Sequence, residues 1–227
     1  MGPLRENSLL GIVFTGGESP PPELIKRLFA GQAKGAMTAA ADSGLTAAEG
    51  AGLRPDWIIG DMDSLDTLSR LDHYLPERVM RHAADKDYTD TELALSLLWE
   101  KGCNELWLVG GGGGRIDHLF AIRSLFERER FPSRWISPAG DIRCVEAPGQ
   151  TASGELALNL EAGALLSVFP LGGGPWQALS RGLKWPLDKV SWDRGFFGVS
   201  NVALTGECAI RAEQGRFMVI VPGLPKV

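Results

Sequence analysis

The chain is poor in cysteine and histidine and has no long hydrophobic run, and each shortage removes a class of protein. Only three of its 227 residues are cysteine and three are histidine. Cys103, Cys144 and Cys208 are far apart and lack metal-ligand spacing, which favours free thiols in a reducing compartment. No apolar stretch is long enough to span a bilayer, and no secretory leader pattern opens the chain. We therefore expect a cytoplasmic protein that is not embedded in a membrane.

The chain also lacks an excess of positive charge. Its 28 acidic and 23 basic residues give a formal net charge of −5. A nucleic-acid-binding or anionic-membrane-binding protein usually has a strongly basic face, so the composition argues against both partners. No Walker A sequence is present either. A polyanionic substrate would need a local device, such as metal ions or a few well-placed cations.

Short apolar runs alternate with helical patterns in the first part of the chain. Strands are predicted near 9–14, 36–41, 57–59, 79–82 and 105–109, and helices near 22–30, 89–101 and 116–129. This alternation is typical of an α/β domain with a doubly wound, mostly parallel sheet. In such sheets ligands bind beyond the carboxyl ends of the strands. We place this domain at residues 1–147.

From residue 148 to residue 227 the pattern changes. Five short apolar or alternating runs follow one another, separated by Gly or Pro, and no helical period survives. They span 156–160, 165–169, 199–204, 208–212 and 217–221. This part is predicted to be an all-β sandwich domain.

Aspartate is concentrated in one segment, with eight residues between positions 56 and 90. Asp61 and Asp63 follow a predicted strand and could be a turn residue and a helix cap. Asp85, Asp87 and Asp90 add further carboxylates, which would repel one another at a shared edge unless a cation joined them. The set therefore favours a metal site, and Mg²⁺ suits hard oxygen ligands and phosphates.

Two further segments have features of phosphate-binding sites. Lys86 and Thr89 stand before a helix whose capping box is Thr89 with Glu92, and a helix N-terminus favours bound phosphate. Capping alone does not explain Lys86. The run 110–114 is all glycine and opens another helix with Arg115, whose guanidinium could form a bidentate pair with phosphate oxygens. By itself the glycine run could be a flexible turn.

The ordered set of motifs resembles the thiamine pyrophosphokinase family. The resemblance runs from about Phe14 to the C-terminus. Each motif alone is weak, but the order is specific. The motifs are Asp42-Ser43-Gly44, Gly60-Asp61-Met62-Asp63-Ser64, Asp85-Lys86-Asp87-Tyr88-Thr89-Asp90, Gly113-Gly114-Arg115-Ile116-Asp117-His118, Gly182-Leu183-Lys184-Trp185-Pro186-Leu187 and Ser200-Asn201.

The resemblance implies a homodimer with active sites between subunits, in which a pyrophosphoryl group passes from ATP to thiamine. It also implies roles for single residues. Those holding Mg²⁺ would be Asp61, Asp63 and Asp90, which with Arg115 form the catalytic set. Those contacting ATP and its phosphates would be Asp42, Lys86, Asp87, Thr89, Gly113, Gly114, Arg115, Asp117 and His118. Those contacting thiamine would be Trp185, Ser200 and Asn201 of the β-sandwich, which would also dimerise.

The chain departs from the family pattern at three positions. Ser43 stands where glycine is common, and Ile122 and Arg123 replace an Asn-Leu pair. Ile122 cannot hydrogen-bond as Asn does, so nucleotide selectivity can differ.

Two rival functions remain open at this point. The first is a metal-dependent phosphohydrolase of nucleotides or phosphate esters with Asp61 as nucleophile, although Leu65 stands where such enzymes usually have Thr. The second is a non-enzymatic regulator that binds a nucleotide or thiamine. A regulator has no evident need for so many carboxylates at one sheet edge.

Overall fold

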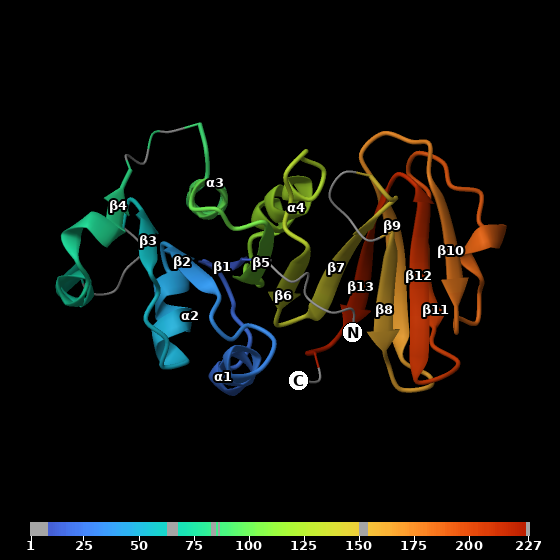
Figure 1. Cartoon of the computed structure of the whole chain (residues 1–227), viewed down its shortest axis with the longest axis horizontal. Coiled ribbons are helices and arrows are strands. Elements are labelled where there is room, and N and C mark those ends of the chain that lie inside the picture. The colour runs from blue at the N-terminus through green and yellow to red at the C-terminus, as the bar shows by residue number, and fades with distance from the viewer. Residues whose placement is uncertain (1–8, 63–67, 83–84, 86, 150–153, 226–227) are drawn as a thin grey trace.

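The computed structural model describes residues 9–62, 68–82, 85, 87–149 and 154–225 (Figure 1). Within these residues, thirteen strands and four α-helices are joined by loops and 3₁₀ turns. The first part contains β1 (Leu10–Thr15), α1 (Pro22–Ala30), β2 (Met37–Ala41), α2 (Gly44–Gly50), β3 (Trp57–Gly60), β4 (Val79–Arg81), α3 (Asp90–Glu100), β5 (Glu105–Gly110) and α4 (Ile116–Leu125). The later strands are β6 (Arg134–Ser137), β7 (Gly140–Glu146), β8 (Glu155–Asn159), β9 (Leu165–Leu171), β10 (Gln177–Arg181), β11 (Gly198–Val202), β12 (Glu207–Gln214) and β13 (Arg216–Pro222).

Six neighbouring strands of one large sheet are parallel, in the order β6-β5-β1-β2-β3-β4. Every residue of the central strand β1 is buried, as expected for a parallel strand that is covered on both faces. Alternate residues of β1 point to opposite faces. Phe14 packs with α1 and α2 residues such as Leu28 and Leu45, whereas Val13 packs with Leu98 of α3. The sheet is thus covered by α1 and α2 on one side and by α3 and α4 on the other (Figure 1).

The same sheet continues with antiparallel strands. β7 follows β6 as a hairpin, β13 pairs with both β7 and β9, and β11 is the far edge. A second sheet of order β10-β12-β8 packs against this half. Phe217 and Val219 of β13 and Ile210 of β12 are fully buried in the core between the sheets. The molecule is therefore a mixed α/β protein with one large, mostly parallel sheet and antiparallel strands.

The ten-stranded sheet crosses the domain boundary expected at residue 147. β7 lies before that position and its partner β13 lies after it. The two parts thus share one sheet, and their separation into two domains stays a prediction. Among the described residues, no helix has both the length and the apolar character needed to cross a membrane.

The structure differs from the sequence-based predictions at several helices and strands. Helix α4 ends at Leu125 and not near residue 129. The carbonyl oxygens of Phe126 and Arg128 instead accept hydrogen bonds from Arg216, both at 2.7 Å. The short helix α2, the β6–β7 hairpin and strand β10 were not expected. The five runs predicted after residue 148 all form strands.

Candidate functional site

The predicted site lies along the edge where the parallel strands end. Strands β1, β2, β3 and β5 run in the same direction, so the residues that follow them reach one edge of the sheet. Asp42 follows β2 directly, Asp61 follows β3, and the glycine run follows β5. In the sheet these four strands lie side by side in the order β5-β1-β2-β3. We call the edge formed by their carboxyl ends, with Asp42, Asp61 and the glycine run, the carboxyl edge.

Asp42 and Asp61 come to adjacent strand ends because β2 pairs with β3, and glycine at position 60 leaves room for the Asp42 side chain. A Cβ at Gly60 would lie 1.8 Å from Oδ1 of Asp42, so any other residue there would displace this carboxylate. The Asp42 amide also donates to the carbonyl of Ile59 at 3.0 Å. The ends of β2 and β3 are therefore joined with the Asp42 side chain packed against Gly60.

In the described part of the chain, three non-glycine residues have a positive φ, and all three belong to the predicted motifs. They are Asp42 at 46°, Met62 at 65° and Ser200 at 59°. Such backbone is uncommon for non-glycine residues and costs energy, so it persists only where surrounding contacts hold it. Met62 is 2% exposed and packs in the α1–α2 core. Its buried side chain therefore anchors the turn that carries Asp61.

The N-terminus of α3 is fixed by the expected capping box. Thr89 Oγ1 accepts from the Glu92 amide at 3.3 Å, and Glu92 Oε2 accepts from the Thr89 amide at 2.7 Å. The first turn is also tied to β1, because the hydroxyls of Thr15 and Thr91 are 2.5 Å apart. Asp90, the first residue of α3, is half-buried. A helix N-terminus thus meets the carboxyl edge at Asp90.

The Glu92 carboxylate joins this cap to a second helix. Burial acts to raise the pKa of Glu92, but hydrogen bonds from Thr89 and Arg128 outweigh burial and hold that pKa below its ordinary value. Arg128, which follows α4, forms an ion pair with Glu92. The N-terminus of α3 is therefore linked to the C-terminal end of α4.

The glycine run is held by backbone hydrogen bonds to the β1 loop. Gly111 donates to the carbonyl of Gly16 at 3.1 Å, and Gly112 exchanges bonds of 2.8 and 2.9 Å with Glu18. These two amides are thus committed to protein structure. Gly113 and Gly114 lie between them and the start of α4, and their contact with a ligand stays a prediction.

Arg115 and Asp117 form an ion pair in front of α4. Nη2 of Arg115 lies 2.6 Å from Oδ2 of Asp117, and both side chains are exposed. The hydrogen bond from Arg115 holds the pKa of Asp117 well below its ordinary range. His118 is exposed in the first turn of α4, and its amide donates to the Arg115 carbonyl. Any phosphate that binds Arg115 must therefore compete with Asp117.

The proposed metal set is only partly described. Asp63 and Lys86 lie outside the described residues. Asp61 and Asp90 are half-buried, and Asp85 and Asp87 are exposed. Within the described part of the chain, no three His, Cys, Asp or Glu side chains form a group that could hold a metal ion. The two described members, Asp61 and Asp90, nonetheless bring carboxylate oxygens to the carboxyl edge, and such oxygens are the ligands that Mg²⁺ prefers.

Arg216 of β13 connects the sandwich to the end of α4, a contact that no sequence pattern indicates. Its Nη1 donates to the carbonyls of Phe126 and Arg128, and its Nε and Nη2 donate to Glu146 at 2.9 and 2.6 Å. Its guanidinium carbon lies 3.6 Å from the centroid of the Phe131 ring. A cation also suits the C-terminal end of a helix. Arg216 therefore fixes the end of the helix whose start carries Arg115.

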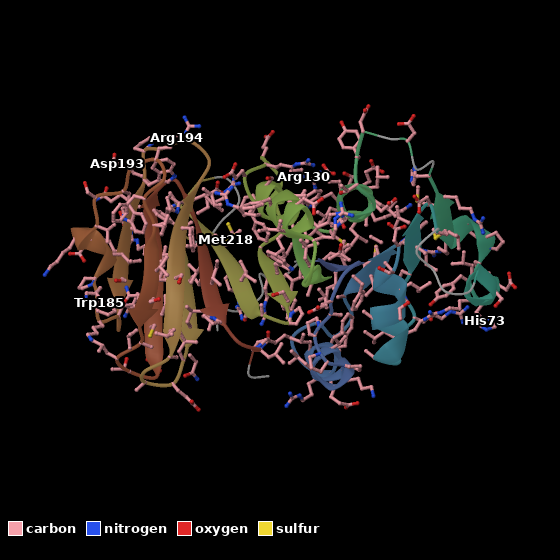
Figure 2. All side chains as sticks on the ribbon, turned by 180° about the vertical axis from the view of Figure 1, so that it is seen from behind. His73, Arg130, Trp185, Asp193, Arg194 and Met218 are labelled. Atoms are coloured by element: carbon pink, nitrogen blue, oxygen red, sulfur yellow. The ribbon has the colours of Figure 1, made fainter. Side chains whose placement is uncertain are left out.

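The three predicted thiamine contacts lie far from the carboxyl edge of the same chain. Ser200 and Asn201 belong to β11, at the opposite end of the ten-stranded sheet from β3 and β4. Figure 2 shows Trp185 on the sandwich half, away from the α/β half. Trp185 is 51% exposed, with Nζ of Lys184 4.6 Å from the ring centroid. Asn201 is buried and bonds the Trp185 amide and carbonyl at 3.1 and 2.6 Å, so it holds the backbone of Trp185.

Comparisons with known proteins agree with the motif order. Residues 32–134 match the family model of the thiamin pyrophosphokinase catalytic domain. The solved thiamin pyrophosphokinase of Geobacillus thermodenitrificans is 24% identical, with 95% of this chain and 97% of that chain covered and a TM-score of 0.70. That of Bacillus subtilis is 22% identical, with 95% and 99% covered and a TM-score of 0.75. That of Candida albicans is 14% identical, with 98% and 94% covered and a TM-score of 0.68.

At these identities the solved structures show a shared fold. A comparison with curated proteins found no match. The family resemblance expected from the motifs is confirmed by the catalytic-domain match, which includes the carboxyl edge from Asp42 to Asp117.

Proposed function

We propose that this chain, whose residues 32–134 form a thiamin pyrophosphokinase catalytic domain, transfers a pyrophosphoryl group from ATP to the hydroxyl of thiamine. The products are thiamine diphosphate and AMP. The catalytic domain makes the chain an enzyme of the thiamine diphosphokinase type. The observation that carries the proposal is the carboxyl edge, where Asp42, Asp61 and the N-terminus of α3 meet beside the glycine run.

We assign Mg²⁺ to the carboxylates of Asp61, Asp63 and Asp90, with Asp42, Asp87 and Asp117 nearby. The support is the chemistry of the donors and their arrival at one sheet edge. The close packing of Asp42 on Gly60 is a cradle that only glycine allows. When bound, the metal supplies charge neutralisation for the phosphates of ATP.

The other residues of this edge orient ATP. The N-terminus of α3 at Thr89, the glycines 113 and 114, and the cations of Lys86 and Arg115 provide hydrogen-bond donors for phosphate oxygens. The thiamine hydroxyl oxygen forms a bond to the β-phosphorus while the bond from that phosphorus to the AMP oxygen breaks. The hydroxyl proton passes to a carboxylate, for which we name Asp63 or Asp90. Such a transition state is loose, so positioning and charge matter more than a strong base.

We further propose a homodimer in which each thiamine pocket draws on both chains. The support is the distance along the sheet between β11 and β3, together with the half-exposed ring of Trp185. A cationic substrate suits an aromatic face. Asn201 would contribute by fixing the Trp185 loop. The three cysteines are unpaired, which suits the reducing conditions of the cytoplasm, where we place the enzyme.

One assay tests the proposed reaction. Purified protein is incubated with ATP and Mg²⁺, with and without thiamine, and AMP and thiamine diphosphate are measured. We expect the two products in equal amounts, and only when thiamine is present. Release of inorganic phosphate or AMP without thiamine would indicate a phosphohydrolase. Binding of ATP and thiamine with no product would indicate a regulator.

A further inference from the structure

Two adjoining cavities lie at the opposite edge of the sheet from the carboxyl edge. The first has a volume of about 440 Å³ and is lined by Arg54, Pro55, Asp56, Tyr74, Leu75 and Arg78. The second has about 330 Å³, shares Asp56 and Arg78, and adds Trp57 and residues 35–37. These residues precede or begin β2, β3 and β4. The cavities therefore lie at the amino ends of the strands, and no predicted site residue lines them.

Each of the two arginines lies over an aromatic ring. The guanidinium carbon of Arg54 lies 5.0 Å from the centroid of Tyr74, and that of Arg78 lies 4.4 Å from the centroid of Trp57. Neither arginine has an acidic partner among the described residues. A ring that holds the face of a guanidinium leaves its N–H edge available, and this edge matches an oxyanion.

The remaining polar groups around these cavities are mostly donors as well. Nζ of Lys101 lies 4.5 Å from the centroid of Trp57. The indole N–H of Trp57 is buried and has no acceptor within the described ranges. The one lining carboxylate, Asp56, accepts through Oδ2 from the amide and hydroxyl of Thr38. The charges that line the cavities are thus two cations against one anion, with Lys101 adjacent.

We propose that these cavities form an oxyanion site that binds a phosphate or diphosphate group, separate from the catalytic edge. The two arginines are held in place before the ligand arrives, so little side-chain entropy is lost on binding. A diphosphate should bind more tightly than a phosphate, because it can reach both guanidinium groups. The inference rests on the cavities and their arginines and is independent of the proposed reaction.

Calorimetric titration with inorganic pyrophosphate, in the presence of EDTA, tests the site. Four proteins are compared: the unaltered chain, Arg54→Gln with Arg78→Gln, Arg115→Gln, and Arg130→Gln. Arg130 is the matched control, since it too lies over a ring (5.1 Å from the centroid of Trp99) but lines neither cavity. Arg115→Gln separates this site from binding at the carboxyl edge.

We expect a binding event that survives in Arg115→Gln and Arg130→Gln but is weakened at least about tenfold in the Arg54→Gln, Arg78→Gln protein. A parallel titration with inorganic phosphate should give weaker binding. Equal affinity in the double variant and in Arg130→Gln overturns the proposal, and so does loss of all binding in Arg115→Gln. The single variants Arg54→Gln and Arg78→Gln decide the question if the double variant does not fold.

Discussion

Asp61 and Asp90 are the described carboxylates from which the proposed metal site can be tested at single residues. Asp61→Asn or Asp90→Asn keeps the side-chain size but removes a charge that would face Mg²⁺ and phosphate. We expect turnover to fall on the order of 100-fold or more, because charge stabilisation in the transition state is lost. Steady-state product formation measures this. Asp72→Asn, an exposed aspartate of the same acidic segment, is the control and should keep its activity. Near-normal turnover in a folded Asp61→Asn protein would remove Asp61 from the metal set.

Arg115 tests the phosphate contact. Arg115→Lys keeps the positive charge but loses the planar fork that now engages Asp117. The KM for ATP should rise about tenfold, with a much smaller change in the KM for thiamine. Kinetics with each substrate varied in turn give both constants. If the ATP dependence does not change, the Arg115–Asp117 pair serves only the start of α4.

The buried pair of Arg134 and Asp141 makes a prediction about stability and pH. Two hydrogen bonds of 2.7 and 2.8 Å join them, and Arg134 is only 2% exposed. Burial acts to raise the pKa of Asp141, but Arg134 and Arg143 outweigh burial and hold that pKa below its ordinary value. Stability from this carboxylate is therefore complete above the unfolded-state pKa of about 3.9 and is lost as the pH falls through the folded-state value.

Asp141→Asn should lower the free energy of unfolding by about 3–5 kcal/mol at neutral pH, because Arg134 is left buried without its counter-charge. Denaturant unfolding at several pH values measures the difference between the two proteins. That difference should shrink once the pH drops below about 4. A difference that stays constant down to the acid-unfolding limit would mean that the charge of Asp141 does not stabilise the fold.

The same pair explains why the β6–β7 hairpin is not predicted from the sequence. Arg134 and Asp141 are charged residues at buried positions of β6 and β7, so the apolar pattern that indicates a strand is interrupted there. Asp42, Asp61 and Arg115 are predicted site residues because motif order marks them. The burial of Met62 and the hydrogen bonds from Asn201 to the backbone of Trp185 are tertiary contacts, which no local pattern reveals.

At the scale of elements, the ends of α3 and α4 are held together by Arg216, Arg128 and Glu92. Arg216→Gln should release the carbonyls of Phe126 and Arg128 and loosen the end of α4. We expect the KM for ATP to rise several-fold, the KM for thiamine to change less, and the free energy of unfolding to fall by about 1.5–3 kcal/mol. Kinetics and denaturant unfolding give these values.

Arg181→Gln provides the control, since Arg181 forms an exposed ion pair with Glu155 within the second sheet. It should change neither constant. Arg216→Lys, which keeps the charge at the helix end, should recover part of the ATP affinity. If Arg216→Gln lowers stability but leaves both KM values unchanged, Arg216 is structural and does not position α4 for ATP.

A helix or strand can be predicted from the sequence when the residues that determine it lie close together along the chain. Helix α3 has its capping box and apolar face within a dozen residues, and the structure confirms it. Helix α4 ends early because Arg216, 90 residues beyond Phe126, takes its carbonyls. The short helix α2 runs from Gly44 to Gly50, and glycine is a weak helix former.

At the scale of the whole molecule, Trp185 tests whether two chains share a site. Trp185→Ala should raise the KM for thiamine by about tenfold and leave the KM for ATP nearly unchanged, since one aromatic face for a cation is lost. Kinetics with each substrate give the result. Phe196→Ala, at a comparably exposed aromatic of the same half, is the control. An unchanged KM for thiamine in Trp185→Ala would mean that Trp185 does not contact thiamine.

Mixing the Trp185→Ala and Asp61→Asn proteins tests the dimer directly. Each variant is weak alone, but one site of a mixed dimer would have both intact parts. Activity should therefore recover in the mixture. Size-exclusion chromatography that shows an active monomer would contradict the shared site.

The arrangement of the whole sheet was the least accessible part of the fold. The sequence shows where strands begin and end, but the pairing of β13 with β7 joins residues that are from 70 positions apart (Arg216 and Glu146) to 82 positions apart (Pro222 and Gly140). Neither β7 nor β13 has a local sequence feature that identifies its partner strand. The α/β and all-β halves were therefore predicted separately, whereas the structure joins them through one sheet.

The pairing of β13 with β7 also affects when the sheet can be completed during synthesis of the chain. Strands β1 to β5 have all their pairing partners once β6 has been made. Strand β7, in contrast, keeps one edge open until β13 has been synthesised, about 70 residues later. An open strand edge can pair with another chain. A chain in which β13 has not yet been made would therefore expose this edge of β7 to its neighbours, and the pairing with β13 covers an edge that could otherwise join two chains.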